Sequence, residues 1–109
     1  MAIPHAQHGQ PIRLLPSGDA AGAEHTTALF KAPDLEVIRL VLRAGQSFPP
    51  HRVAGSITVQ CLGGAIDFTV GDQHVTLRAG ELLYLPGGAL HGLTGIEDAT
   101  ALVTIALHA

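Results

Sequence analysis

The hydrophobic and polar residues of this chain alternate in short runs, and turn-forming residues lie between the runs. Runs of this kind occur at residues 26–32, 35–42, 56–62, 65–70, 73–80, 81–86, 89–94 and 100–107. Most of them end at glycine, proline or aspartate, and no helical period of 3.6 residues persists over three turns. About eight short strands with close turns predict an all-β antiparallel fold, built as a sandwich or barrel.

The clearest local prediction is a hairpin at residues 70–73, Val-Gly-Asp-Gln. A Gly-Asp pair between two alternating runs is the signal of a two-residue hairpin loop. In the run before the loop, Ile66 and Phe68 share one face of the strand, while Asp67 and Thr69 share the other. This strand is therefore expected to place one face in the core and the other in solvent.

The first part of the chain has a different composition. Residues 1–25 contain several prolines and an Ala/Gly-rich run, and we expect a weakly structured segment or an arm that lies on a partner. Residues 26–109 are expected to form one barrel domain. The N-terminus has no basic start followed by a useful apolar stretch, and no window approaches the ~18 apolar residues of a membrane helix. We therefore expect a cytoplasmic protein with no membrane partner.

Composition adds an expectation about assembly. Of the 109 residues, 47% are hydrophobic and only 14% are charged, against a usual charged share of roughly 25%. A small monomer with so few charges would expose much apolar surface, so we expect a homodimer with the apolar segment 26–32 at its interface. The formal net charge is −3, and the scattered arginines form no nucleic-acid-binding patch. The single cysteine, Cys61, fits a reducing compartment.

Two stretches share a joint spacing that is more specific than any one of their turn residues. The first is GQSFPPHRVAGSITVQCLGG at residues 45–64, and the second is GELLYLPGGALH at residues 80–91. The first resembles the first conserved motif of the cupin superfamily in its spacing, and the second resembles the second motif. The matching positions are Gly45, His51 and Gly64 in the first stretch and Gly80, Pro86, Gly88 and His91 in the second.

The resemblance extends over roughly residues 26–107 and implies a fold. Cupins are small antiparallel double-sheet jelly-roll barrels, open at one end, with a pocket between the sheets. In metal-bearing cupins the first motif supplies a His-x-His pair and a glutamate, and the second supplies one histidine. Here His51 and His91 keep two of these positions, whereas Val53 stands at the second histidine and Ile57 at the glutamate. The resemblance therefore implies either a Zn, Ni, Fe or Mn site short of ligands or a pocket without metal.

Gln60 is the candidate for a third ligand, because its amide oxygen could bind a metal and it lies in an apolar run. Strict alternation puts Ile57, Val59 and Cys61 on the pocket face and Gln60 on the other face. A β-bulge at Gly55 would shift the register by one residue and turn Gln60 into the pocket. Both arrangements stay open at this point.

Tyr84 is a second candidate for chemistry. The resemblance to metal-free cupins that isomerise sugars implies that it could act as an acid beside a histidine base, and the alternative is an ordinary barrel aromatic. The expected pocket walls are apolar, which favours an apolar or mixed ligand over a phosphate or nucleotide. They consist of Val53, Ile57, Val59 and Leu85.

Three function classes follow from these candidates. We expect first a small-molecule-binding cupin with a His-lined pocket, whose catalytic status is open. The alternatives are a metal-dependent dioxygenase or isomerase based on His51 and His91, and a metal-free isomerase with a histidine base. No Gly-rich loop precedes a helix, and no nucleophile stands beside a base, so nucleotide binding and covalent catalysis are not indicated.

Overall fold

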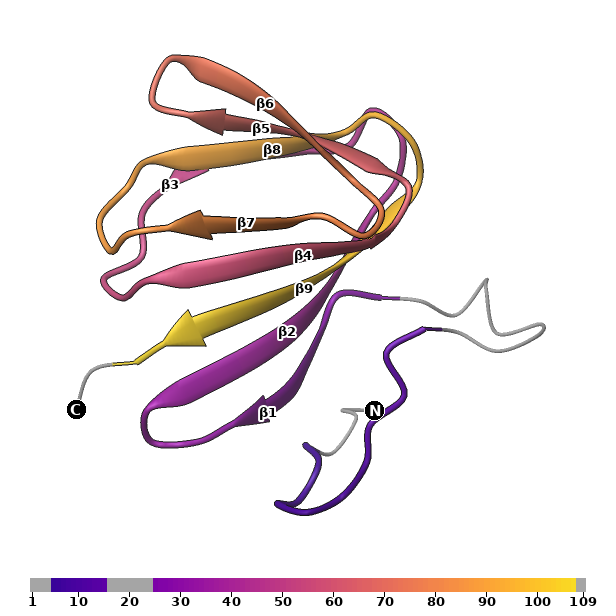
Figure 1. Ribbon diagram of the computed structural model, residues 1–109, viewed down its shortest axis with the longest axis vertical. Coiled ribbons are helices and arrows are strands. Elements are labelled where there is room, and N and C mark those ends of the chain that lie inside the picture. The colour runs from indigo at the N-terminus through magenta and orange to yellow at the C-terminus, as the bar shows by residue number, and fades with distance from the viewer. Residues whose placement is uncertain (1–4, 16–24, 108–109) are drawn as a thin grey trace.

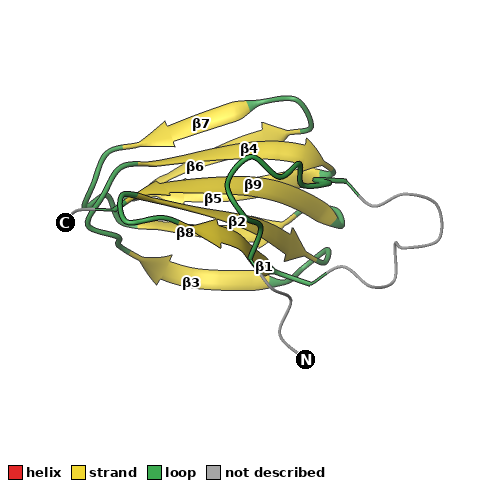
Figure 2. Cartoon of the chain, turned by 90° about the horizontal axis from the view of Figure 1, so that it is seen from below, coloured by secondary structure: helices red, strands yellow, loops and turns green. Residues whose placement is uncertain are grey.

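The computed structural model describes residues 5–15 and 25–107, so expectations for residues 1–4, 16–24 and 108–109 lie outside the described residues (Figure 1). The described residues contain strands and loops and no helix (Figure 2). Within them, therefore, nothing qualifies as a helix able to cross a membrane. The strands are β1 (Thr27–Lys31), β2 (Leu35–Leu42), β3 (Ser47–His51), β4 (Ile57–Gly63), β5 (Ala65–Val70), β6 (Gln73–Arg78), β7 (Leu82–Leu85), β8 (His91–Gly95) and β9 (Ala99–Ala106).

The strands form two antiparallel sheets. One sheet has the order β1-β2-β9-β4-β7 and the other has the order β3-β8-β5-β6. Consecutive strands change sheet at most connections, as in a jelly roll. The predicted all-β double-sheet barrel is therefore confirmed.

The core lies between the two sheets and follows the alternation along each strand. In β4 the residues Ile57, Val59 and Cys61 are buried, and in β5 Ile66 and Phe68 are buried. These side chains form one cluster with residues of β2, β6, β7, β8 and β9. Burial also raises the pKa of the Cys61 thiol, so this cysteine is a core residue and not a nucleophile.

Strand β3 was absent from the sequence-based strand prediction, because Pro49 and Pro50 lie within it. Proline has no N–H to donate and is tolerated mainly in edge strands. β3 is an edge strand of the four-stranded sheet, and its pairing with β8 is irregular between Phe48 and His51. The prolines occupy the irregular part of the ladder, so the strand continues to His51 despite them.

Two glycines confirm or correct local predictions. Gly71 has φ +61° and begins the two-residue loop that pairs Val70 with Gln73, so the hairpin prediction is confirmed. Gly55 lies before β4 and not in a bulge within it. A Cβ on Gly55 would lie 1.8 Å from the Ala106 carbonyl oxygen, so this glycine is required for a close approach of two backbones.

Residues 5–15 contain no strand and lie beside β1 (Figure 1). The Ala6 amide donates to the Leu29 carbonyl at 2.9 Å, and Nη1 of Arg39 donates to the Arg13 carbonyl at 3.1 Å. A groove of about 500 Å³ separates this segment from β1 and β2. The division into a segment 1–25 and a domain 26–109 stays a prediction.

Candidate functional site

The two motif histidines come from neighbouring strands of the four-stranded sheet. His51 ends β3, His91 begins β8, and the two residues pair directly in register. His91 also pairs with Val70 of β5. Because side chains two residues apart share a face, His91 points to the same side as the buried Leu93. The histidines therefore belong to the last inward row of this sheet.

This row lies at one end of the barrel. The β3–β4, β5–β6 and β7–β8 connections meet there, at the left in Figure 1. The ring centroids of His51 and His91 are 4.5 Å apart, with the ring planes tilted by 55°. His91 is only 4% exposed, whereas His51 is exposed. One imidazole is thus held inside the barrel end, and the other covers it from the solvent side.

Backbone carbonyls orient both rings in the same way. Nδ1 of His91 lies 3.0 Å from the Ala89 carbonyl oxygen, and Nδ1 of His51 lies 3.4 Å from the Pro49 carbonyl oxygen. A carbonyl oxygen only accepts, so Nδ1 must carry the proton in each contact. A neutral ring with its proton on Nδ1 presents an unprotonated Nε2 atom. The shorter contact fixes the orientation of the His91 ring more strongly than that of the His51 ring. Metal-ligating histidines are commonly oriented in this way, by donating the other ring N–H to a backbone carbonyl.

The loops that carry the two motifs are tied together beside the histidines. The Gly88 amide donates to the Val53 carbonyl at 2.8 Å, and Nε of Arg52 donates to the Gly88 carbonyl at 3.2 Å. The Gly71 amide donates to the Leu90 carbonyl at 3.1 Å. These bonds join the loop after β3 and the hairpin loop after β5 to the segment before His91, so they fix its position.

The two vacant ligand positions are filled by packing side chains. Val53 is half-buried against the core cluster, and Ile57 is 4% exposed within it. Gln60 is exposed on the opposite face of β4, so of the two arrangements left open by the sequence the structure has the one in which Gln60 lies outside the pocket and is no candidate third ligand. No bulge at Gly55 shifts the register, and the strict alternation holds. Within residues 5–15 and 25–107, no group of three or more His, Cys, Asp or Glu side chains could hold a metal ion.

Tyr84 also lies away from the histidines. It pairs with Thr58 on the outward face of the five-stranded sheet and is 61% exposed. The idea that Tyr84 acts as an acid beside a histidine base is therefore wrong for the histidines of its own chain. The remaining wall candidates, Val59 and Leu85, are buried members of the core cluster.

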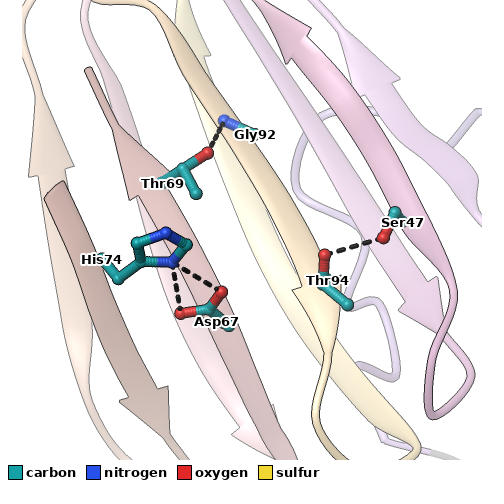
Figure 3. Close-up of polar contacts among 6 residues, drawn as sticks. All are labelled: Ser47, Asp67, Thr69, His74, Gly92 and Thr94. Carbon is teal, nitrogen blue, oxygen red and sulfur yellow. Dashed lines mark hydrogen bonds and ion pairs between the residues drawn. The ribbon is translucent and has the colours of Figure 1, made fainter. Parts of the chain in front are cut away.

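One residue of the histidine row was missed from the sequence. Gln73 pairs with Val70, which pairs with His91, so Gln73 stands in the same inward row at the edge of the sheet. The two-residue hairpin contained the signal, because it places Gln73 directly opposite Val70. His74, by contrast, points outward and contacts Asp67 at 3.0 Å (Figure 3).

Comparison with known proteins places these observations in a family. The family model described as "Cupin domain" matches residues 38–107. These residues include both histidines, most of β2 and all of the strands from β3 to β9. A search of curated proteins found no match.

Solved structures show the same fold. A conserved protein of unknown function from Streptococcus pyogenes has a TM-score of 0.78 at 19% identity, over 100% of this chain and 96% of that one. An RmlC-like cupin from Desulfovibrio desulfuricans has a TM-score of 0.77 at 24% identity, over 91% and 97%. A variant of salicylate 1,2-dioxygenase from Pseudoaminobacter salicylatoxidans has a TM-score of 0.64 at 20% identity, over 67% and 21%. At these identities the likeness concerns the fold alone.

Proposed function

Because this chain belongs to the cupin family, we propose that it binds a small molecule at the His51–His91 pair of its barrel end. The observation that carries the proposal is the pairing itself. Two imidazoles from neighbouring strands meet at a centroid distance of 4.5 Å, each with Nδ1 directed at a backbone carbonyl. Such an arrangement leaves two Nε2 atoms for a ligand, and a solvated pair of surface histidines would not need it.

The chemistry of the pair defines the ligand class. A neutral imidazole whose Nδ1 is protonated accepts a hydrogen bond at Nε2. The neighbouring side chains Val53, Val70 and Ala89 are apolar and partly buried. A ligand with hydroxyl or enol donors on a compact apolar body fits both features. An Nε2 atom that accepts such a proton could also act as a general base, although binding does not require catalysis.

The residues present do not fit a metal centre of the kind implied by metal-bearing cupins. Structural and catalytic zinc sites use at least three protein ligands. The chain offers two imidazoles, while Val53, Ile57 and the outward Gln60 supply nothing to an ion. We therefore assign ligand recognition to the two imidazoles themselves and derive no step through Zn, Ni, Fe or Mn.

The test is a fragment screen by NMR on untagged protein. A panel of small aromatic and aliphatic hydroxyl compounds should shift the ring resonances of His51 and His91 and leave those of His74 unchanged. His91→Ala should weaken the best fragment at least tenfold, whereas His74→Ala, which removes an exposed histidine from the outer face of the same sheet, should not change it. Fragments that bind equally to wild type and His91→Ala would contradict the proposal.

A further inference from the structure

The guanidinium of Arg39, on the outward face of β2, is only partly satisfied by the residues around it. Its Nη1 donates to the Arg13 carbonyl at 3.1 Å. Its Nε is buried and has no hydrogen-bond partner, and among the described residues that are not themselves exposed no other side-chain nitrogen or oxygen is in this state. A buried donor without an acceptor is destabilising, and nearly all such groups in native proteins are paired. An acceptor for Nε must therefore come from elsewhere than these residues.

Arg39 lies in the groove of about 500 Å³ between residues 5–15 and the strands β1 and β2. This volume is within the range of small-molecule sites. Arg13 and His5 line the same groove, and none of the described residues that line it is acidic. Basic side chains in a concave surface without a counter-charge attract an anion. The groove therefore suits a ligand with negative charge.

An apolar surface lies beside this charge. Leu29 lines the groove and is only 8% exposed, although it does not belong to the core cluster between the sheets. The pairing of β1 with β2 is irregular between Ala28 and Phe30, and the extra residue of a bulge is left out of the ladder. The Leu29 carbonyl accepts from the Ala6 amide instead, at 2.9 Å. Ile12 lines the groove from residues 5–15, so apolar groups are present on both sides of it.

We propose that this groove binds a small organic carboxylate, with its carboxylate at Arg39 and its apolar body against Leu29 and Ile12. The planar guanidinium matches a carboxylate through two parallel N–H donors. Because Nη1 is used by the Arg13 carbonyl, the edge formed by Nε and Nη2 is the one that receives the two carboxylate oxygens. Phosphate also matches a guanidinium edge, but inorganic phosphate has no apolar body to cover Leu29.

The attachment of residues 5–15 allows a ligand to reach the buried Nε. Two hydrogen bonds join the described part of this segment to the sheet, one from the Ala6 amide and one to the Arg13 carbonyl. Segments held by few bonds open at a small cost in free energy. A carboxylate at Nε and Nη2 uses neither of these bonds, so the segment can adjust and stay attached. Binding should then stabilise the attached state by mass action.

This groove is separate from the proposed ligand site. His51 and His91 lie in the other sheet, and their Nε2 atoms are expected to accept a proton from a hydroxyl or enol group. Arg39, by contrast, donates to an anion. The two sites therefore differ in ligand class, and failure of one proposal leaves the other standing.

The test is an NMR titration of the untagged, ¹⁵N-labelled full chain with phenylacetate and with 2-phenylethanol, its neutral counterpart of similar size. Phenylacetate should move the Arg39 Nε–H resonance downfield and slow hydrogen exchange of the Ala6 amide, with a dissociation constant on the order of 1 mM. 2-Phenylethanol should change neither signal below about 10 mM, because it lacks the charged acceptor. Inorganic phosphate should bind about tenfold more weakly than phenylacetate, because it buries no apolar surface.

Two variants that each remove one positive charge separate the fork from general charge. Arg39→Gln should weaken phenylacetate about tenfold or more, because it removes the bidentate donor. The matched control is Arg78→Gln, at an exposed position of β6 in the other sheet, and it should leave the affinity within about twofold, because solvent screens a distant charge. The Ala6 amide resonance of each ligand-free variant reports whether residues 5–15 are still attached.

The wild-type titration decides the proposal without any variant. An Arg39 Nε–H resonance that does not respond to about 10 mM phenylacetate would overturn it, since that is well above the expected dissociation constant. So would equal binding of 2-phenylethanol or of inorganic phosphate, because the ligand would then not be recognised as an organic carboxylate. An Arg39→Gln protein that binds like wild type, or an equal loss in Arg78→Gln, would place the anion elsewhere and would likewise contradict the proposal.

Discussion

The outward faces of the two sheets differ in chemistry. The four-stranded sheet carries hydrogen-bonded polar pairs on its outward face (Figure 3). Ser47 and Thr94 hydroxyls lie 2.7 Å apart, and Asp67 contacts His74 at 3.0 Å. The outward face of the five-stranded sheet has leucine, valine, threonine and tyrosine at the equivalent positions, and Arg39 is the one charged residue on that face of the described strands.

This difference separates two roles. Polar side chains that hydrogen-bond to one another need no further partner, so the outward face of the four-stranded sheet can face solvent. The histidines lie on the inward face of the same sheet, at one end of the barrel. An exposed apolar face gains stability when other apolar groups cover it. The core of the jelly-roll fold constrains only the inward residues of each strand. The outward residues of either sheet can therefore be polar or apolar.

The largest expected effect tests the alternation along β4. Val59 is 1% exposed, and Gln60 beside it is exposed. Val59→Asp buries an unpaired carboxylate and should lower the free energy of unfolding by about 4 kcal/mol or more. Gln60→Asp should change it by less than about 0.5 kcal/mol. Urea unfolding at several protein concentrations separates folding from association, and equal losses at the two positions would contradict the register.

A second pair of variants tests whether metal ligands can be restored. Val53 lies half-buried in the loop after β3, and Val53→His should raise Ni²⁺ affinity about tenfold, which corresponds to about 1.4 kcal/mol. Ile57 is in the core of the five-stranded sheet, so Ile57→Glu should destabilise the apo-protein by about 3 kcal/mol. Titration calorimetry and urea unfolding measure the two effects. A well-folded Ile57→Glu protein that binds nickel tightly would place that side chain at the histidines.

A smaller effect on the free energy of unfolding is expected for Thr69, on the outward face of the four-stranded sheet. Thr69 Oγ1 accepts from the Gly92 amide at 3.1 Å (Figure 3), and Gly92 is buried. Thr69→Val keeps the shape of the side chain but leaves this amide unpaired, at a cost of about 1–2 kcal/mol. Thr76→Val, at an exposed position of β6, should cost less than about 0.5 kcal/mol. Identical unfolding midpoints for the two variants would show that the Thr69 bond adds nothing.

The smallest effect concerns the exposed pair Asp67 and His74. Their side chains are 31% and 68% exposed, so solvent screens their interaction. A double-mutant cycle with Asp67→Asn and His74→Gln should give a coupling of about 0.2–1 kcal/mol. A coupling above about 2 kcal/mol would mean that the four-stranded face is held by charge, and not by its whole set of polar pairs.

The sequence predicted most of the fold, because alternation and turn residues act locally. The hairpin at Gly71 and the inward position of Phe68 are examples. β3 could not be predicted from alternation and turn residues, because its two prolines are typical of strand ends and are tolerated mainly in edge strands. Gln60 shows a different limit, because the run around it fitted two registers, and the pairing of β4 with β7 and β9 decides between them.

Of the candidate site, the sequence predicted only the residues that belong to the two motifs. The spacing of the two motifs identified His51 and His91, which the structure places side by side. Tyr84 was a candidate because the resemblance to metal-free cupins implies a tyrosine acid and the chain has a single tyrosine, but the side to which a strand residue points depends on its register with β4. Gln73 was missed because its place in the histidine row depends on two successive strand pairings.

The most direct test of the central claim is the tautomer of His91, measured by long-range ¹H–¹⁵N NMR on the uniformly labelled protein. The contact between Nδ1 and the Ala89 carbonyl predicts a proton on Nδ1 and a bare Nε2 in the neutral ring, with the exposed His25 as an internal reference. A His91 ring that carries its proton on Nε2 would contradict the account, because the acceptor atom assigned to the ligand would then not exist.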